Sequence, residues 1–175
     1  MSATLLIRYG SIPEVGRFAQ HTDPPPERGS RVVVQSHRGP QLGTVLQVLN
    51  PPRAASPPED EMLDPVLRPA TDEDDRTHAT LCREAQRDFE LWRRRIAEWK
   101  LDLELIDLEW TLDRQKLILY VLGGRGADTT RLALQAAAQG LAVIEVQPVT
   151  AEGAVPMPSA AGGGCGSGGE CGCHS

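Results

Sequence analysis

The sequence has no apolar run long enough to cross a membrane. A transmembrane helix needs about 20 consecutive apolar residues, and this 175-residue chain, although 40% hydrophobic, contains no such run. Its first residues, 1–8, also lack the basic stretch and apolar segment of a secretory signal. We therefore expect no membrane span and a cytoplasmic location.

Basic residues are also too few for a chain that binds the phosphate groups of nucleic acids on its own. Eighteen Lys and Arg residues stand against 24 Asp and Glu residues, which gives a net charge of −6. Affinity for nucleic acids comes mainly from basic groups. Arg93–Arg95 covers nearly a full helical turn next to acidic residues, so a solvated face is favoured over an RNA patch. We expect no direct binding of nucleic acid.

Enzyme motifs are missing as well. The glycine-rich stretch 123–126 is not followed by the Lys-Ser or Lys-Thr pair of a phosphate-binding loop. His21, His37 and His78 have no cysteine or carboxylate constellation near them in sequence, so we interpret them as structural or surface residues. The acidic residues of 104–113 fit a solvated strand edge as well as an acid–base set: Glu104, Asp107, Glu109 and Asp113. We therefore predict a protein that is not an enzyme.

Residues 101–122 predict a β-hairpin. Two apolar runs flank the polar residues 113–116, which suit a turn between antiparallel strands. In the first strand the apolar residues change parity between Leu105 and Ile106, which predicts a bulge there. The second strand, 117–122, is almost wholly apolar, as expected of a strand covered on both faces.

A long helix is predicted just before this hairpin. Thr71 and Asp74 match a capping box, with acidic residues in the first turn. Six residues then follow at spacings of three and four, which places them on one helical stripe: Cys82, Ala85, Phe89, Trp92, Ile96 and Trp99. We interpret Cys82 as a buried core residue. A second, alanine-rich helix is predicted from Asp128, with Thr129 or Thr130 as its cap, to Gly140, and a strand over 141–149 follows.

Together these elements predict an α+β fold with helices on one face of the sheet. Residues 1–50, with apolar runs at 4–9, 32–34 and 44–49, form a small β module of three short strands. The proline-rich residues 51–70 act as a connector, and 71–150 form the α+β core. Residues 151–175, rich in Gly, Ala and Ser, are expected to be a disordered tail.

This tail holds the residues that most resemble a metal site. Three of the four cysteines lie in its last eleven residues, with a histidine beside them: Cys165, Cys171, Cys173 and His174. Thiolate and imidazole groups suit zinc or an iron–sulfur cluster. The spacing matches no standard Cys-x-x-Cys pair. Metal or cluster ligation, thiol redox or transfer chemistry, and an inert tail all stay open.

Several stretches in this order resemble the bacterial YaaT/RicT family, whose shared unit is the polymerase-suppressor C-terminal homology domain. The resemblance covers most of residues 5–149, and its clearest parts are 29–34, 38–45, 67–74, 108–116 and 143–147. The residues Leu108–Lys116, LEWTLDRQK, are similar to the family's hairpin turn. The family's compact Cys-Gly-Arg-x-x-Cys-Cys element is absent. The tail cysteines are either its rearranged counterpart or an unrelated metal-binding tail.

The resemblance implies a non-catalytic, cytoplasmic regulatory protein. Members of the family join two small helical proteins, RicA and RicF, in a complex that carries iron–sulfur clusters and directs ribonuclease Y in messenger RNA maturation. By this resemblance the chain would act through such partners and share a cluster with them. An independent metal or thiol carrier is the alternative, with the tail as its working part.

Overall fold

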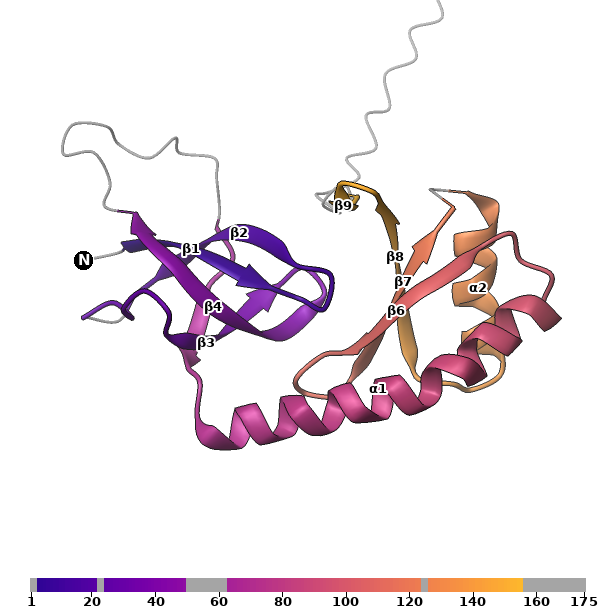
Figure 1. Ribbon diagram of the computed structural model, residues 1–175, viewed down its shortest axis with the longest axis horizontal. Coiled ribbons are helices and arrows are strands. Elements are labelled where there is room, and N and C mark those ends of the chain that lie inside the picture. The colour runs from indigo at the N-terminus through magenta and orange to yellow at the C-terminus, as the bar shows by residue number, and fades with distance from the viewer. Residues whose placement is uncertain (1–2, 22–23, 50–62, 124–125, 156–175) are drawn as a thin grey trace, which may run out of the picture.

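Two β-sheets lie at opposite ends of a long helix (Figure 1). The arrangement comes from a computed structural model that describes residues 3–21, 24–49, 63–123 and 126–155. The N-terminal sheet lies beside the first half of the helix, and the second sheet lies above its other half. The predicted α+β class is confirmed. The predicted disordered tail falls largely on residues 156–175, which lie outside the described residues.

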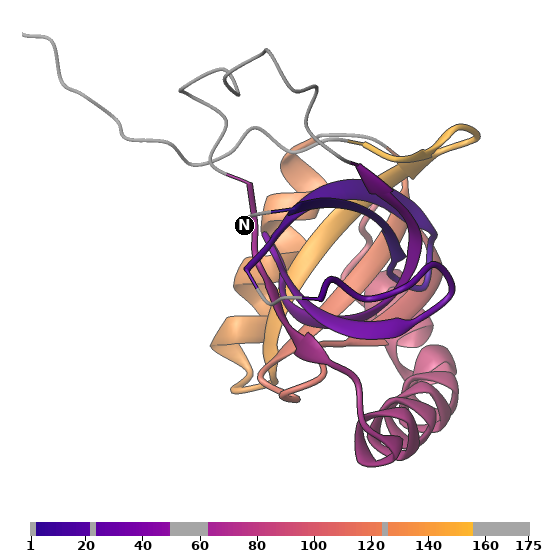
Figure 2. The same cartoon turned by 90° about the vertical axis from the view of Figure 1, so that its left-hand side faces the viewer.

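The first sheet has five antiparallel strands in the order β2-β1-β4-β3-β5. Its strands are β1 (Ala3–Tyr9), β2 (Glu14–Gln20), β3 (Arg31–Ser36), β4 (Gly39–Leu49) and β5 (Val66–Pro69). The amide of Ala19 in β2 donates to the carbonyl of Asp64, 2.9 Å away, just before β5. This contact brings the two edges of the sheet together, and Figure 2 shows the strands curled into a ring.

Two of these strands were not predicted. Strand β2 has a weak apolar signal, because Val15 points outward and Phe18 is the one large apolar side chain that it buries in the core. Strand β5 lies inside the proline-rich stretch 51–70 that we expected to act as a connector. It pairs only with β3, on the edge of the sheet, where the missing amide of Pro69 is tolerated. The three predicted strands correspond to β1, β3 and β4.

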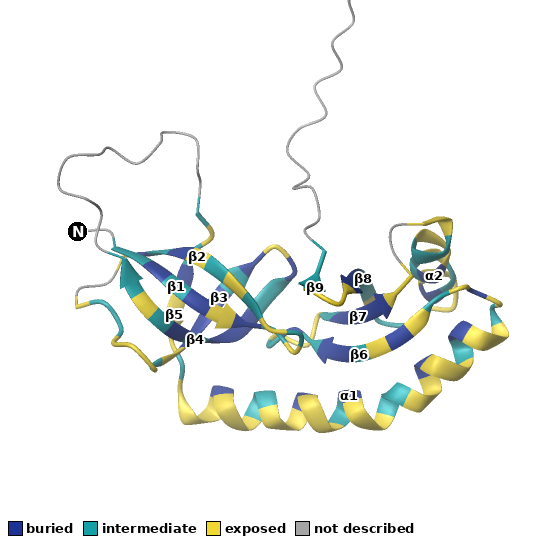
Figure 3. Cartoon of the chain, turned by 45° about the horizontal axis from the view of Figure 1, so that its top comes forward, coloured by how far each residue is buried: buried dark blue, intermediate teal, exposed yellow. Residues whose placement is uncertain are grey.

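Helix α1 (Asp72–Glu98) starts at the predicted capping box. The hydroxyl of Thr71 accepts from the amide of Asp74 at 3.3 Å, and the Asp74 carboxylate accepts from the Thr71 amide at 2.8 Å. Its buried apolar residues are Leu81, Ala85, Trp92 and Ile96, whereas the opposite face is exposed along the helix (Figure 3). The prediction that Cys82 belongs to the core is wrong. Leu81 occupies the buried position, and Cys82 lies at the margin of the stripe and is exposed.

The second sheet has the order β6-β7-β8-β9 and is mixed. Its strands are β6 (Glu104–Trp110), β7 (Lys116–Leu122), β8 (Val143–Thr150) and β9 (Gly153–Ala154). Strands β6 and β7 form the predicted hairpin, and the register shifts between Leu105 and Asp107, where we predicted a bulge. Strand β8 runs parallel to β7 because helix α2 (Ala127–Ala138) crosses over between them.

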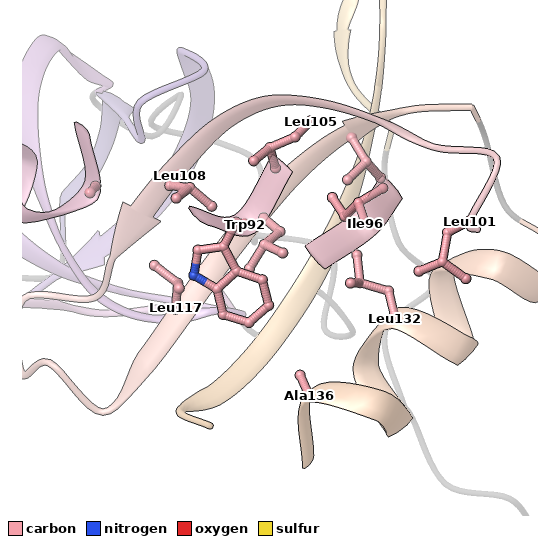
Figure 4. Close-up of a cluster of buried hydrophobic side chains, with 11 residues drawn as sticks. Trp92, Ile96, Leu101, Leu105, Leu108, Leu117, Leu132 and Ala136 are labelled. Carbon is pink, nitrogen blue, oxygen red and sulfur yellow. The ribbon is translucent and has the colours of Figure 1, made fainter. Parts of the chain in front are cut away.

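Helices α1 and α2 cover the same face of this sheet. Figure 4 shows side chains from both helices meeting those of β6 and β7 in one apolar cluster. The start of α2 differs from the prediction, since its N-cap is Gly126 and neither Thr129 nor Thr130 caps it. Its end agrees with the prediction. Gly140 has a φ of 64°, and the Leu141 amide donates to the Ala136 carbonyl at 3.1 Å, as in a Schellman motif.

Candidate functional site

The other face of the second sheet meets the first sheet in a junction of buried polar side chains. Glu109 of β6 is at its centre, with 7% of its surface exposed. Its carboxylate accepts three hydrogen bonds, from Gln41 Nε2 at 2.8 Å, from the Tyr120 hydroxyl at 2.6 Å and from the Ser11 amide at 2.9 Å. A buried carboxylate is tolerated when its oxygens are hydrogen-bonded. The sequence allowed Glu109 to be part of a solvated strand edge. In the structure it is buried and is not part of such an edge.

Arg38 is the cation of this junction and is almost completely buried. Its guanidinium donates to the Tyr120 hydroxyl at 3.1 Å and forms an ion pair with Glu14. The guanidinium carbon also lies 5.7 Å from the centre of the Tyr120 ring, within cation–π range. Tyr120 thus receives a hydrogen bond from Arg38 and passes one to Glu109, which links the cation and the anion through a single hydroxyl.

Burial and the neighbouring Glu109 carboxylate raise the pKa of Tyr120 far above its ordinary value. The hydroxyl therefore keeps its proton over the physiological pH range and remains the donor to Glu109. A tyrosine held in this way cannot act as a general base near neutral pH. Its role in this arrangement is to hold the two sheets together.

The β3–β4 turn fixes the position of Arg38. The Ser36 hydroxyl accepts from the Arg38 amide at 3.2 Å and donates to Gln41 Oε1 at 2.6 Å. Gly39 has a φ of 132°, and a Cβ placed on it would lie 3.1 Å from Thr111 Cγ2. The Leu112 amide donates to the Pro40 carbonyl at 2.8 Å. The β3–β4 turn and the β6–β7 turn therefore dock backbone to backbone, and the φ of Gly39 makes a substitution by any other residue strained.

Beside the junction lies a cleft of about 460 Å³ between β1, β4, α1 and β6. One wall carries the carboxylates of Asp107 and Glu109, and Ser11 donates its hydroxyl proton to Asp107. The opposite wall is helix α1, where His78 Nε2 and Cys82 Sγ lie 3.6 Å apart. The volume falls in the range of small-molecule sites. The cleft thus brings a thiol, an imidazole and two carboxylates to one place.

Sequence reasoning missed the pairing of His78 with Cys82, because it treated His78 as isolated. A spacing of four residues on a helix places two side chains on the same face, and that signal was available. Burial and the charges of Glu109 and Asp107 raise the pKa of the Cys82 thiol. Cys82 is therefore protonated at neutral pH and is not activated as a nucleophile.

The residues predicted to bind metal lie elsewhere in the chain. Cys165, Cys171, Cys173 and His174 are outside the described residues. In the part of the chain that the structure describes, no group of three or more His, Cys, Asp or Glu side chains is arranged to hold a metal ion. Neither of the two helices described has the combination of length and hydropathy that crossing a membrane requires.

A comparison with known protein families matches a region that contains part of the junction and of the cleft. Residues 64–136 match the family model described as the PSP1 C-terminal conserved region. Searches of curated proteins and of solved structures returned no match. The matched residues run from just before β5 into α2, and so they include Glu109 and Tyr120 of the junction as well as His78 and Cys82. The resemblance inferred from the sequence is thus confirmed, and this chain carries the PSP1 C-terminal conserved region, the domain of YaaT/RicT family proteins.

Proposed function

We propose that this protein is a non-catalytic, cytoplasmic adaptor of the YaaT/RicT type that acts through protein partners in the regulation of RNA processing. The observation that carries the proposal is the family match over residues 64–136. By family resemblance, the partners are small helical proteins of the RicA and RicF type and ribonuclease Y.

The chemistry of the junction supports a structural role for its charged groups. Glu109 accepts three hydrogen bonds, and Arg38 is bound to Tyr120 and Glu14. Groups occupied in this way join two sheets and leave little capacity for a substrate. Helix α1 meanwhile spans both sheets and keeps one face exposed along its length. Such an arrangement, in which a fixed body presents a long open surface, is compatible with an adaptor.

We further propose that Cys165, Cys171, Cys173 and His174 supply ligands to an iron–sulfur cluster shared with the partners, or to zinc. The chemistry of these donors supports this, since thiolates and imidazole are the ligands that both prefer. The alternative is an independent metal or thiol carrier that uses the same tail. The chain has four cysteines in all, and Cys82 is the one that lies among the described residues.

The test is co-purification without oxygen, with and without candidate helical partners and ribonuclease Y. For an adaptor, we expect a stable complex with these partners that contains iron and sulfide in equal amounts, two or four of each per cluster. The metal content and the binding of partners are then measured again in the full chain with Cys165, Cys171 and Cys173 replaced by serine. Stoichiometric zinc in the isolated chain favours the carrier. RNA cleavage by the pure protein that disappears in Glu109→Gln would contradict the non-catalytic proposal.

A further inference from the structure

Four arginines form one row along the face of α1 opposite its buried side: Arg76, Arg83, Arg87 and Arg94. All four are exposed, and they follow one another at spacings of seven, four and seven residues. Because each helical residue adds about 100°, these spacings keep the four positions within about 20° of one line along the helix. This arginine row is roughly 27 Å long. It follows the uncovered face of α1, which runs beside both sheets (Figure 3).

The arginine row has no carboxylate partner in the part of the chain that the structure describes. None of its four guanidinium groups forms an ion pair there. Two acidic residues of the same helix are bound to arginines outside the row, Glu84 to Arg114 at 2.7 Å and Glu90 to Arg93 at 3.2 Å. The row therefore leaves four guanidinium groups available to another molecule.

An apolar side chain lies among these charges. Leu91 is 40% exposed, and it is four residues after Arg87 and three before Arg94, so it neighbours both on the helix surface. Burial of an apolar side chain against another protein is favourable, whereas a sugar–phosphate backbone is contacted mainly through charges and hydrogen bonds. Residues 76–98 carry six arginines and four Asp or Glu residues, a net charge of only +2. Both observations favour a protein partner over RNA.

A second copy of this chain does not suit the arginine row in a symmetric pairing. The spacings seven, four and seven read the same in both directions, so antiparallel helices that cross at Ala85 place each arginine opposite an arginine. A parallel pairing about a two-fold axis places each residue opposite itself and has the same result. Like charges that face each other across an interface weaken it. The complementary surface is therefore acidic and belongs to a different protein.

The shape of the row favours a helix as its partner. Its spacings are those of a helical repeat, so a second helix lying alongside α1 can present carboxylates at the same intervals. A guanidinium group binds a carboxylate through two parallel hydrogen bonds. We propose that the arginine row binds an acidic helix of a partner protein, which also covers Leu91 with an apolar side chain. The proposal rests on the adaptor function proposed above and names the surface and the chemistry of the partner.

The experiment measures the binding of a designed helical peptide to the full chain by fluorescence anisotropy. The labelled, alanine-based peptide carries glutamates at spacings of seven, four and seven residues, with a leucine placed to meet Leu91. In a second peptide, glutamine replaces the four glutamates. We expect the glutamate peptide to bind at least about tenfold more tightly than the glutamine peptide, because only the former provides opposite charges. Its affinity should fall as the salt concentration rises.

Charge reversal tests the position of the site. Arg83→Glu combined with Arg87→Glu should weaken binding of the glutamate peptide more than about tenfold, because two attractions become repulsions. Arg28→Glu combined with Arg93→Glu is the matched control, since it changes the net charge equally at exposed positions outside the row, and it should bind like the unmodified chain. The variant reversed in the row should bind a peptide whose two central glutamates are replaced by lysine. A misfolded variant would not gain this binding.

The inference is overturned if the glutamate peptide binds no better than the glutamine peptide, or if both double variants lose binding equally. A dimer in sedimentation that the row variant abolishes, or tighter binding of a labelled single-stranded RNA to the row, would also overturn it. The co-purification test of the adaptor function is separate. Partners that co-purify equally with the row variant leave the adaptor function standing without this surface. Peptide binding without any co-purifying partner leaves this surface standing without the adaptor function.

Discussion

Strand β7 is buried on both faces, but by different chemistry. Leu117, Leu119 and Val121 face helices α1 and α2 in a wholly apolar cluster. Ile118 and Tyr120 face the first sheet, where a small apolar contact with Ile12 adjoins the network of Arg38, Tyr120 and Glu109. The helix side depends on volume and surface area, whereas the junction side depends on each polar atom finding its partner.

The largest effect is expected where the junction loses its anion. Glu109→Leu leaves three donors without their acceptor, of which those of Gln41 and Tyr120 are buried. Removal of one partner from a buried charged network costs about 3–5 kcal/mol. Urea unfolding should show this loss, and Glu104→Leu, an exposed position on the same strand, should change the free energy of unfolding little. Equal effects of the two substitutions would show that the network contributes nothing.

On the apolar face, Leu119→Ala should cost about 2–5 kcal/mol. The side chain is fully buried under the helices, and its loss removes apolar contacts and leaves a cavity. Leu122→Ala is the matched control, because Leu122 is 44% exposed on the same strand. Thermal and urea unfolding measure both. A loss as small as that of the control would mean that this face is not the packed core.

Tyr120→Phe tests the hydroxyl that links Arg38 to Glu109, while the ring stays in place. Hydrogen bonds to charged groups contribute about 1.5–3 kcal/mol, so we expect a loss of that size in the free energy of unfolding. Tyr9→Phe serves for comparison, since the Tyr9 ring packs on Phe18 in the first sheet. If Tyr120→Phe is as stable as the unmodified chain, the hydroxyl does not carry the link.

The smallest effect is expected outside both faces, at the start of α1. Thr71→Ala removes the N-cap and should cost about 1 kcal/mol, whereas Thr130→Ala, in the first turn of α2, should cost less.

Hydrogen bonds from Arg68 and Thr71 hold the pKa of Asp74 well below its ordinary value. The carboxylate therefore stabilises the fold above about pH 4 and loses this contribution as pH falls further.

Asp74→Asn measures this pH dependence. The difference in unfolding free energy between this variant and the unmodified chain should be full at pH 7 and shrink below about pH 4. The same difference at pH 3 and pH 7 would contradict a role for the Asp74 charge.

The same comparison explains what the sequence could predict. The apolar repeat of 117–121, the parity change at Leu105 and the capping box at Thr71 are local signals, and the structure confirms all three. Two of the three polar partners of Glu109, Gln41 and Ser11, lie far away in sequence, and no periodicity predicts them. Ser11 precedes Glu109 by 98 residues, so the carboxylate looked like part of a solvated edge. Spacing along one strand does not reveal a partner on another sheet.

The candidate site also has one feature that the sequence could predict and one that it could not. Four-residue spacing on a helix is enough, from the sequence alone, to pair His78 with Cys82. Their position opposite Asp107 and Glu109 could not have been predicted, because it depends on how α1 crosses β6 beside the first sheet. The metal-binding prediction for Cys165, Cys171, Cys173 and His174 remains a prediction.

The sequence separation within the junction also determines the order in which its residues are synthesised on the ribosome. Arg38 leaves the ribosome before its partner Tyr120 has been made, because 82 residues separate them. Domains form from the N-terminus during synthesis, and contacts between distant residues must wait. Until the hairpin of β6 and β7 emerges, the Arg38 guanidinium has Glu14 of the first sheet as a partner, but its side toward Tyr120 faces water. The nascent chain has a hydrated face at the surface that will later be its interior.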